Sequence, residues 1–403
     1  MLGDLKTYTE WMDKCSHCAF CEATCPVYLA DLLETHVARS RMMVIRESLL
    51  NNTLPQSKRV HEIINRCLLC SNCTQTCPAS IPVDEIVIAA RYRLYGGKRM
   101  QLPKRILLKR FMEKRGVTGA MRKLEGLART AGIIPKEIPT SSKKAFEDRY
   151  AGTYEPTGEV RAKAVYFVGC ATNTLYPDTG DAVMKVLAQN GITVTVPDGL
   201  VCCGIPALAE GDIKTARQMM ESNLNILAAI ESDVILTDCT SCGMTLKEKL
   251  SKLFPRDDSL YEKATAVSAK IKEVTDYLVE VGLTTDPTEP IAPFTYHIPC
   301  HGAWTPGLND APRKILLKIP NARMVEMEEP EKCCGAGGTF FTEFKSLSET
   351  IRNPKIEDIQ NTGVKTVVTQ CPSCRSYLNS ALADIDVIHP MAMLARAYGF
   401  KSE

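Results

Sequence analysis

Aromatic side chains are scarce in this sequence, and its net charge is close to zero. Phe, Trp and Tyr make up 6% of the 403 residues, and 49 Lys and Arg against 47 Asp and Glu give a net charge of +2. Nucleic-acid binding depends on basic surfaces and on aromatic rings that stack on bases. We therefore expect no nucleic-acid partner.

Long apolar runs are also missing. Nothing approaches the roughly 18 consecutive apolar residues that a transmembrane helix requires. The first residues lack the basic stretch and apolar stretch of a secretory signal peptide. We therefore expect a cytoplasmic protein. In that reducing compartment clustered cysteines serve metal or redox chemistry rather than disulfides.

Signatures of organic cofactors are absent as well. The chain has no P-loop, no flavin fingerprint and no Ser–His–Asp set. The glycine-rich stretch 335–338 lacks the spacing and the acidic partner of a dinucleotide site, so we interpret it as backbone wrapped around a metal cluster. Hydride chemistry on an organic substrate needs an organic cofactor, so that step would belong to another subunit.

Cysteine is the residue that the chain has in excess. Of its 18 cysteines, eight lie between positions 15 and 77, five between 170 and 242, and five between 300 and 374. A chain of this length can form two or three domains. The grouping predicts a small N-terminal domain, a connecting segment and two similar C-terminal halves.

The eight N-terminal cysteines form the pattern CxxCxxCxxxCP twice. In this motif three closely spaced thiolates bind one [4Fe–4S] cubane, and the cysteine before proline binds the other cubane. The predicted ligands of the first cubane are Cys15, Cys18, Cys21 and Cys77. The predicted ligands of the second cubane are Cys67, Cys70, Cys73 and Cys25.

A zinc site fits these motifs poorly, because zinc needs four ligands, typically two CxxC pairs, and each motif carries a third cysteine. The 41 residues between Cys25 and Cys67 exceed a minimal ferredoxin connection. They include a predicted amphipathic helix over residues 37–50. Two adjacent cubanes would conduct electrons rather than catalyse a reaction by themselves.

The two C-terminal halves repeat a five-cysteine pattern, in which Cys-Cys-Gly and then CxxC follow a first cysteine. The first set is Cys170, Cys202, Cys203, Cys239 and Cys242, and the second is Cys300, Cys333, Cys334, Cys371 and Cys374. Equivalent cysteines lie 130 to 132 residues apart, which is the spacing of duplicated domains. Five cysteines exceed what one zinc ion needs. The glycines Gly204 and Gly335 would let the backbone pass close to sulfide or iron.

Apolar runs and helical stretches alternate in each half, which predicts mostly parallel α/β units. The expected strands are 164–168, 192–196, 234–237, 295–298, 323–327, 366–369 and 385–388, and the expected helices include 178–190 and 207–230. Several cysteines follow directly after these strands. In open α/β sheets that edge is where ligands bind.

Residues 98–145 are strongly basic, with apolar residues interleaved. Three interpretations stay open. The segment is a solvated linker helix packed on its own protein, a helix lying on an anionic membrane surface, or a docking site for an acidic partner.

At this point the chain resembles the cysteine-rich CCG-domain iron–sulfur subunits of heterodisulfide reductases and of glycolate, lactate and glycerol-3-phosphate oxidoreductases. The resemblance rests on the two five-cysteine repeats behind the double ferredoxin motif. It implies a noncubane [4Fe–4S] cluster at each five-cysteine set, since all ten positions are filled. One noncubane cluster and one zinc ion is the alternative.

The cysteine grouping and the alternation of strands and helices predict the fold, the basic segment leaves membrane contact open, and the resemblance implies the partner proteins. We expect an α+β and α/β protein, with a helical double [4Fe–4S] ferredoxin domain at 1–97 and a basic helical connector at 98–160. Two pseudo-symmetric CCG domains would follow at 161–290 and 291–403. The expected partners are an FAD-containing hydroxyacid dehydrogenase and an electron-transfer flavoprotein, with peripheral contact to the inner face of the membrane as an option.

The resulting hypothesis is an iron–sulfur subunit that passes electrons between a flavoprotein lactate or glycolate dehydrogenase and a quinone or other carrier. The alternative is the catalytic subunit of a heterodisulfide-reductase-like disulfide reductase. No catalytic residue is assigned. His301, next to Cys300, is interpreted as structural, with proton donation near the cluster as the other option. His17 is interpreted as a local hydrogen-bonding residue.

Overall fold

The computed structural model describes residues 2–113, 119–156 and 158–400. These residues divide into two compact units. The smaller unit comprises Met1–Arg105, Gly204–Gln218 and Lys332–Lys355, and the larger comprises Ile106–Cys203, Met219–Glu331 and Ile356–Glu403. The smaller unit therefore joins the N-terminal cysteine motifs to the segment that begins at the glycine of the first Cys-Cys-Gly and to the segment that contains the second.

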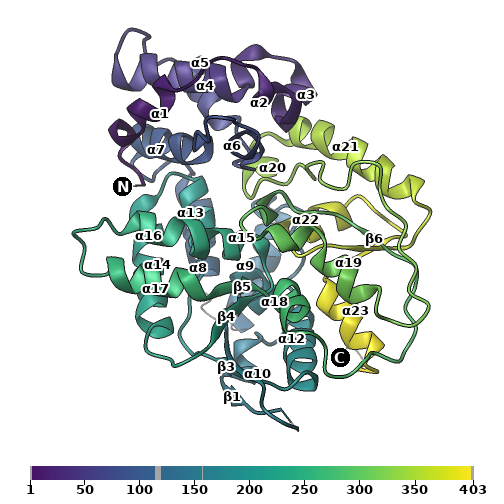
Figure 1. The fold of residues 1–403 in the computed structure, drawn as a ribbon. Helices are drawn as coiled ribbons and strands as arrows, with labels where there is room; N and C mark the ends of the chain where they lie inside the picture. The colour runs from purple at the N-terminus through teal and green to yellow at the C-terminus, as the bar shows by residue number, and fades with distance from the viewer. Residues whose placement is uncertain (1, 114–118, 157, 401–403) are drawn as a thin grey trace. The chain divides into compact units, whose positions relative to one another are not determined.

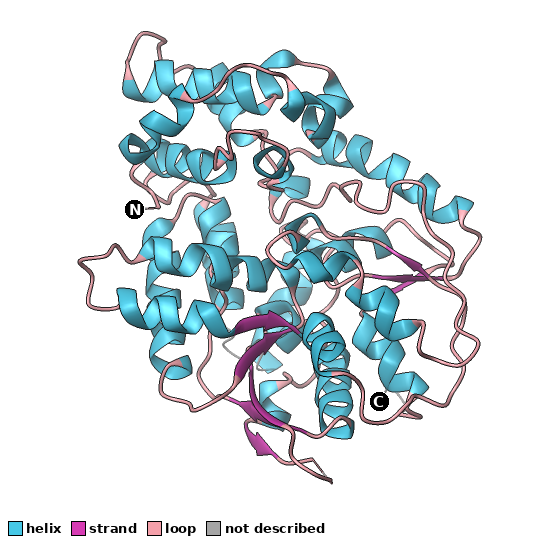
Figure 2. Cartoon of the chain, in the orientation of Figure 1, coloured by secondary structure: helices cyan, strands magenta, loops and turns pink. Residues whose placement is uncertain are grey.

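The described part of the smaller unit is helical (Figures 1 and 2). Its helices are α1 (Thr9–Asp13), α2 (Phe20–Thr24), α3 (Pro26–Asp31), α4 (Ala38–Ile45), α5 (Lys58–Asn65), α6 (Asn72–Gln75), α7 (Val83–Tyr95), α13 (Ile205–Ala209) and α20 (Phe340–Glu343). Helix α4 continues as a π turn over Arg46–Leu50, so the helix predicted for 37–50 is present. Three helices have residues in both units: α8 (Leu102–Met112), α14 (Ile213–Leu227) and α21 (Lys345–Asn361).

The larger unit holds two sheets. One has the order β1-β3-β2-β4-β5, built from β1 (Gly152–Tyr154), β2 (Ala162–Tyr166), β3 (Ile192–Val196), β4 (Val234–Thr237) and β5 (Ile271–Glu273). The other has the order β6-β7-β8, built from β6 (Thr295–Tyr296), β7 (Thr366–Val368) and β8 (Asp386–Ile388). All neighbouring strands run parallel except the antiparallel pair of β1 and β3. The predicted α/β character of this region is confirmed.

Helices surround both sheets of the larger unit (Figure 2). They are α9 (Gly119–Thr130), α10 (Glu147–Tyr150), α11 (Cys170–Thr174), α12 (Pro177–Gln189), α15 (Thr240–Met244), α16 (Leu250–Leu253), α17 (Tyr261–Lys270), α18 (Val274–Val281), α19 (Ala311–Leu316), α22 (Pro372–Asn379) and α23 (Pro390–Ala397). One apolar core includes Val194 of the first sheet and Val368 of the second, together with Val183 of α12 and Leu394 of α23. This shared core packs the two repeats against each other.

Two predicted elements differ from the observed ones. Residues 323–327 form a single bridge, between Phe294 and Met324, instead of a strand. The helix expected over 207–230 is divided into α13 and α14 near Gly211, which has φ +72°. A Cβ at Gly211 would lie 2.7 Å from the backbone of Arg91, so the chain turns there to pass close to α7.

Part of the basic segment lies outside the described residues, including Lys114 and Arg115. Two of its described stretches form α8 and α9, whereas residues 131–145 contain no helix. Its contact with a membrane or partner stays a prediction. Within the described ranges, no helix is both long and apolar enough to cross a membrane. The predicted domain boundaries also stay predictions.

Candidate metal centres

The two ferredoxin-type motifs fold into loops with matching backbone geometry. In the first motif His17 and Ala19 have φ values of +54° and +69°, and in the second Leu69 and Ser71 have +58° and +62°. These pairs occupy equivalent positions around the central cysteine of each motif. Left-handed conformations cost energy at residues other than glycine and are typical of ligand-binding loops. Their repetition indicates that both loops are shaped to hold the same kind of group.

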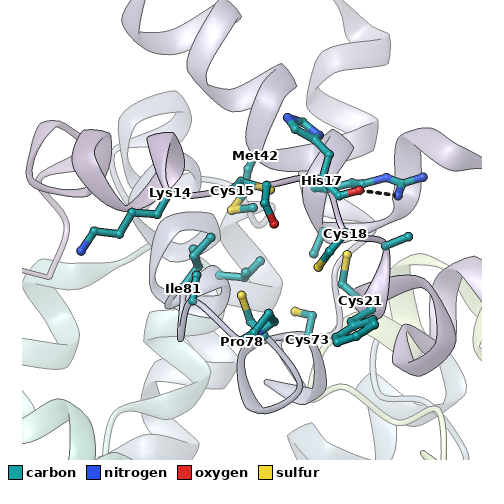
Figure 3. Close-up of a pocket in the computed structure, with 17 residues that line it drawn as sticks. Lys14, Cys15, His17, Cys18, Cys21, Met42, Cys73, Pro78 and Ile81 are labelled. Carbon is teal, nitrogen blue, oxygen red and sulfur yellow. Dashed lines mark hydrogen bonds between the residues drawn. The ribbon is translucent and has the colours of Figure 1, made fainter.

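One cavity of the smaller unit is lined by the cysteines predicted to bind the first cubane: Cys15, Cys18, Cys21 and Cys77. Figure 3 shows Cys15, Cys18 and Cys21 around this cavity, together with Cys73 of the second motif. Cys18 is exposed, and so is the neighbouring Phe20. This cavity therefore opens to solvent beside Cys18.

A second cavity is lined by Cys25, Cys67, Cys70 and Cys73. These four were predicted to bind the second cubane, and Cys25 reaches them from the first motif. Cys73 lines both cavities, so the two cavities share a wall. In the second cavity, three thiols come from the second motif and the fourth is Cys25, the cysteine before proline in the first motif. The first cavity has the reciprocal set, with Cys77 from the second motif, and Cys73 lines it as a fifth cysteine.

The protonation of these thiols fits a metal site. Burial raises the pKa of Cys21 and Cys25, and it raises that of Cys73 well above the usual value. Without metal these sulfurs therefore keep their protons at neutral pH. Because thiolate is the form that binds metal, iron binding at these positions must release protons.

The first five-cysteine set is gathered at the carboxyl ends of strands in the larger unit. Cys170 follows β2 and Cys239 follows β4, and these two strands are parallel neighbours. The Sγ atoms of Cys170 and Cys202 are 3.4 Å apart. Hydrogen bonding with Cys203 and Cys239, together with burial, raises the pKa of Cys242 well above the usual value.

Every cysteine of the first set is buried. Gly169 allows this close gathering, because a Cβ at that position would lie 3.1 Å from the Sγ of Cys242. Sequence reasoning did not select Gly169. Its place directly before Cys170 was the signal available.

The second five-cysteine set is described in its two parts. Cys300, Cys371 and Cys374 belong to the larger unit, where Cys300 follows β6 and Cys371 follows β7. Hydrogen bonds from Cys374 and Ser241 oppose the effect of burial and lower the pKa of Cys371 to about 6. In the smaller unit Cys333 and Cys334 are buried, and the amide of Gly335 donates a hydrogen bond to the Sγ of Cys333 at 3.3 Å.

The two CxxC loops of the larger unit contact each other. The amide of Thr240 donates to the carbonyl of Gln370 at 3.2 Å, and the hydroxyl of Ser241 lies 3.9 Å from the Sγ of Cys371. The same hydroxyl is hydrogen-bonded to Nδ1 of His301 at 2.9 Å. Ser241 is a residue that sequence reasoning missed, although serine precedes the last cysteine of both CxxC motifs. His301 is thus positioned by the opposite repeat. The other histidine considered from the sequence, His17, is exposed.

Backbone conformation and close neighbours also favour glycine in the two Cys-Cys-Gly motifs, besides proximity to metal or sulfide. Both have φ +84°. A Cβ would lie 3.3 Å from the Cα of Ala216 at Gly204, and 2.6 Å from the carbonyl oxygen of Ser348 at Gly335. The backbone of α21 therefore excludes a side chain at Gly335, whereas α14 would be tightly contacted by one at Gly204.

The glycine-rich stretch 335–338 packs on the second ferredoxin loop within the smaller unit. A Cβ at Gly337 would lie 2.8 Å from Leu68, which is next to Cys67. Cys333, Leu68 and Cys25 share one apolar cluster. The second Cys-Cys-Gly segment is therefore packed beside the second four-cysteine cavity.

Comparison with known proteins identifies the domains that contain these cysteines. Residues 11–81 match the 4Fe-4S dicluster domain, and residues 164–247 and 294–379 each match the cysteine-rich domain, CCG. A fumarate reductase (CoM/CoB) subunit from Methanothermobacter marburgensis is 27% identical, over 97% of this chain and 73% of its own.

Two further relatives span most of both chains. The probable glycolate oxidase iron-sulfur subunit of Bacillus subtilis is 23% identical over 96% of this chain and 94% of its own, and the glycolate oxidase iron-sulfur subunit of Escherichia coli is 28% identical over 91% and 89%. The chain belongs to the family of iron–sulfur electron-transfer proteins that join a 4Fe-4S dicluster domain to two cysteine-rich CCG domains.

Proposed function

We propose that this chain is the iron–sulfur subunit of an oxidoreductase complex. It would pass electrons between an FAD-containing 2-hydroxyacid dehydrogenase, acting on lactate or glycolate, and a quinone or other carrier. The observation that carries this proposal is the pair of adjoining cysteine-lined cavities, which share Cys73. Relatives named as glycolate oxidase iron–sulfur subunits supply the substrate class.

The thiols of each cavity fit a cubane, because thiolates are soft ligands that favour iron–sulfur clusters. Cys15, Cys18, Cys21 and Cys77 would hold the first cubane, and Cys67, Cys70, Cys73 and Cys25 the second. When bound, such clusters accept and release single electrons. Exposed Cys18 leaves the first cavity accessible to a partner, whereas buried Cys25 keeps water from part of the second.

The five-cysteine sets would each hold a noncubane [4Fe–4S] cluster. The convergence of five buried thiols supports this for the first set, since five ligands exceed what one zinc ion needs. For the second set the proposal rests on the sequence repeat. A zinc ion in place of one noncubane cluster is the alternative.

Partners follow from the same reasoning. The flavoprotein dehydrogenase would supply electrons, with an electron-transfer flavoprotein as a further carrier. The basic segment 98–145 would contact either an acidic partner or the inner face of the membrane.

The test uses the full chain, purified anaerobically together with its partner subunits. Addition of lactate or glycolate should bleach the visible absorption of the clusters when the flavoprotein is present, and should leave it unchanged when the flavoprotein is absent. A Cys77→Ser variant is the matched control, because it should lose one cubane and slow the bleaching. The proposal fails if neither hydroxyacid reduces the clusters while a heterodisulfide rapidly oxidises the reduced protein.

That second outcome would support a disulfide reductase. This candidate is favoured by the presence of all ten cysteines of the two five-cysteine sets. The relative named for a fumarate reductase (CoM/CoB) also supports it. A noncubane cluster with an accessible iron would be the place where the sulfurs of a disulfide bind.

A further inference from the structure

Arg41 is an unusual side chain of the smaller unit, because its charge is buried without a carboxylate partner. It lies on α4 and is 2% exposed. Its guanidinium donates to the carbonyl oxygens of Ile63 at 2.9 Å, His36 at 2.6 Å and Arg66 at 2.9 Å. Among the described residues, no carboxylate lies within ion-pair distance of it. A buried charge without a counterion is strongly destabilising.

The cavity of the second cubane is where the missing counterion would lie. Arg41 lines that cavity with Cys25, Cys67, Cys70 and Cys73. The carbonyl of His36 that accepts from Arg41 is also 3.7 Å from the Sγ of Cys25. The carbonyl of Arg66 belongs to the residue just before Cys67. Arg41 is therefore fixed against both chain segments that supply the thiols of this cavity.

Arg39 provides an internal comparison, two residues earlier on the same helix. It lines the first cavity, but its guanidinium is ion-paired with Glu22 and with Glu34, the latter at 2.8 Å. Those carboxylates neutralise its charge. The two cavities thus differ, since the arginine of the first is ion-paired with two carboxylates, whereas the buried arginine of the second makes no ion pair among the described residues.

We propose that Arg41 is the counterion of the second cubane and raises its reduction potential. This inference rests on the proposed cubane assignment. A cluster held by four thiolates is anionic, and each added electron increases its negative charge, so a nearby cation stabilises the reduced form more than the oxidised form. Burial has the opposite effect, because it disfavours the more highly charged form. Arg41 offsets this effect, so the second cubane stays reducible by electrons arriving at the first.

Asp84 carries the opposite charge beside the same cavity and therefore allows a second test. It is 5% exposed, lines the same cavity and accepts a hydrogen bond from the hydroxyl of Thr74 at 3.2 Å. Its negative charge should destabilise the reduced cluster. Replacing Arg41 and replacing Asp84 by uncharged residues should therefore move the same potential in opposite directions.

The experiment is a redox titration of the full chain followed by electron paramagnetic resonance, with the second cubane identified as the signal lost in Cys25→Ser. Arg41→Gln should shift the midpoint potential of that cubane downward, Asp84→Asn should shift it upward, and Arg41→Lys should keep it near the parent value. Arg39→Gln, the matched control, should leave it unchanged.

An assembled second cubane with the parent potential in Arg41→Gln would overturn the inference, as would an equal shift in Arg39→Gln. If Arg41→Gln does not assemble this cubane, then Arg41→Lys and Asp84→Asn decide. An unchanged potential in Asp84→Asn would overturn the inference. So would a large downward shift in Arg41→Lys, because that variant keeps the positive charge. Absence of the second cubane signal from the unmodified protein would instead refute the cubane assignment.

Discussion

Cys25 and Cys77 are the fourth cysteines of their motifs, and each lines the cavity whose other three predicted ligands come from the opposite motif. Each is followed by a proline, and Pro26 is the first residue of α3. Proline without an N–H suits the start of a helix and turns the chain away after the thiol. At the scale of single residues, this crossing joins the two motifs into one bicluster unit.

The crossing predicts a reciprocal loss of clusters. Cys77→Ser should remove the first cubane and keep the second, whereas Cys25→Ser should do the reverse, each with a loss of about 4 iron. Iron analysis and electron paramagnetic resonance of the two variants measure this, and each variant is the control for the other. The assignment would be wrong if either substitution removed the cubane of its own motif and kept the other.

Ser241 shows what single-residue reasoning from sequence could not find. Its hydroxyl lies between Nδ1 of His301 and the Sγ of Cys371, which are 60 and 130 residues away along the chain. The equivalent Ser373 is exposed. The repeat pattern places serine at both positions, but the packing of the repeats decides which serine contacts the other repeat's cysteine.

At the scale of elements, the Cys-Cys-Gly turn is linked to the helix that follows it. In the second repeat the hydroxyl of Ser348 on α21 donates to the carbonyl of Gly335 at 2.7 Å, and the backbone of α21 leaves no room for a Cβ at that glycine. The turn that presents Cys333 and Cys334 is thus held against a long helix.

Gly335→Ala should therefore be more damaging than Gly338→Ala. Both glycines have positive φ, which costs alanine roughly 1–2 kcal/mol, but a Cβ at Gly338 would meet nothing within 4 Å. We expect Gly335→Ala to lower the thermal midpoint and the iron content further than Gly338→Ala does. Equal losses in the two variants would show that the contact with α21 does not matter.

Glu273 gives α18 a buried acidic N-cap. Its carboxylate accepts from the amides of Thr275 at 2.7 Å and Asp276 at 3.1 Å. Burial nevertheless raises its pKa from 4.5 to about 8. Between these values the folded state keeps a proton that the unfolded state has released. Stability from this group is therefore fully present below about pH 4.5 and is lost as the pH rises through about 8.

The thermal midpoint should therefore decrease as the pH is raised from 5 to 8. Glu273 should lower the free energy of unfolding by at most about 1.4 kcal/mol per pH unit over this range. Glu273→Gln should flatten that decline. Glu280→Gln, on the same helix with a 58% exposed side chain, should not. Circular dichroism melts at several pH values make the comparison, and parallel pH profiles for the parent and Glu273→Gln would contradict the prediction.

At the scale of the whole molecule, the total metal content of the three cysteine groups distinguishes two noncubane clusters from one noncubane cluster and one zinc ion. Two cubanes and two noncubane clusters require about 16 iron per chain, whereas one zinc-bearing site would leave about 12. We expect about 16 iron with an equal amount of sulfide and no zinc, measured on anaerobically purified protein. A value near 12 with one zinc would establish the mixed alternative.

Much of the site could be predicted from the sequence, because cysteine spacing restricts which thiols can reach one cluster. The two tetrads that line the cavities are those predicted from the paired motifs, and the parallel strands preceding Cys170 and Cys239 were also predicted. The strand predicted at 323–327 was wrong, because that segment pairs through a single bridge. Apolar alternation marks a segment that can pair, but tertiary contacts decide its pairing.

The number of thiols, their grouping and the duplication of the five-cysteine pattern can be read from the chain alone, because these depend on local spacing. The folded chain is needed to see that Arg41 is buried without an ion pair, that Arg39 is neutralised, and that Gly335 is held against α21. Burial and charge compensation arise from segments far apart in the sequence. The environment of the second cavity therefore follows from packing, whereas its cysteines follow from the motif.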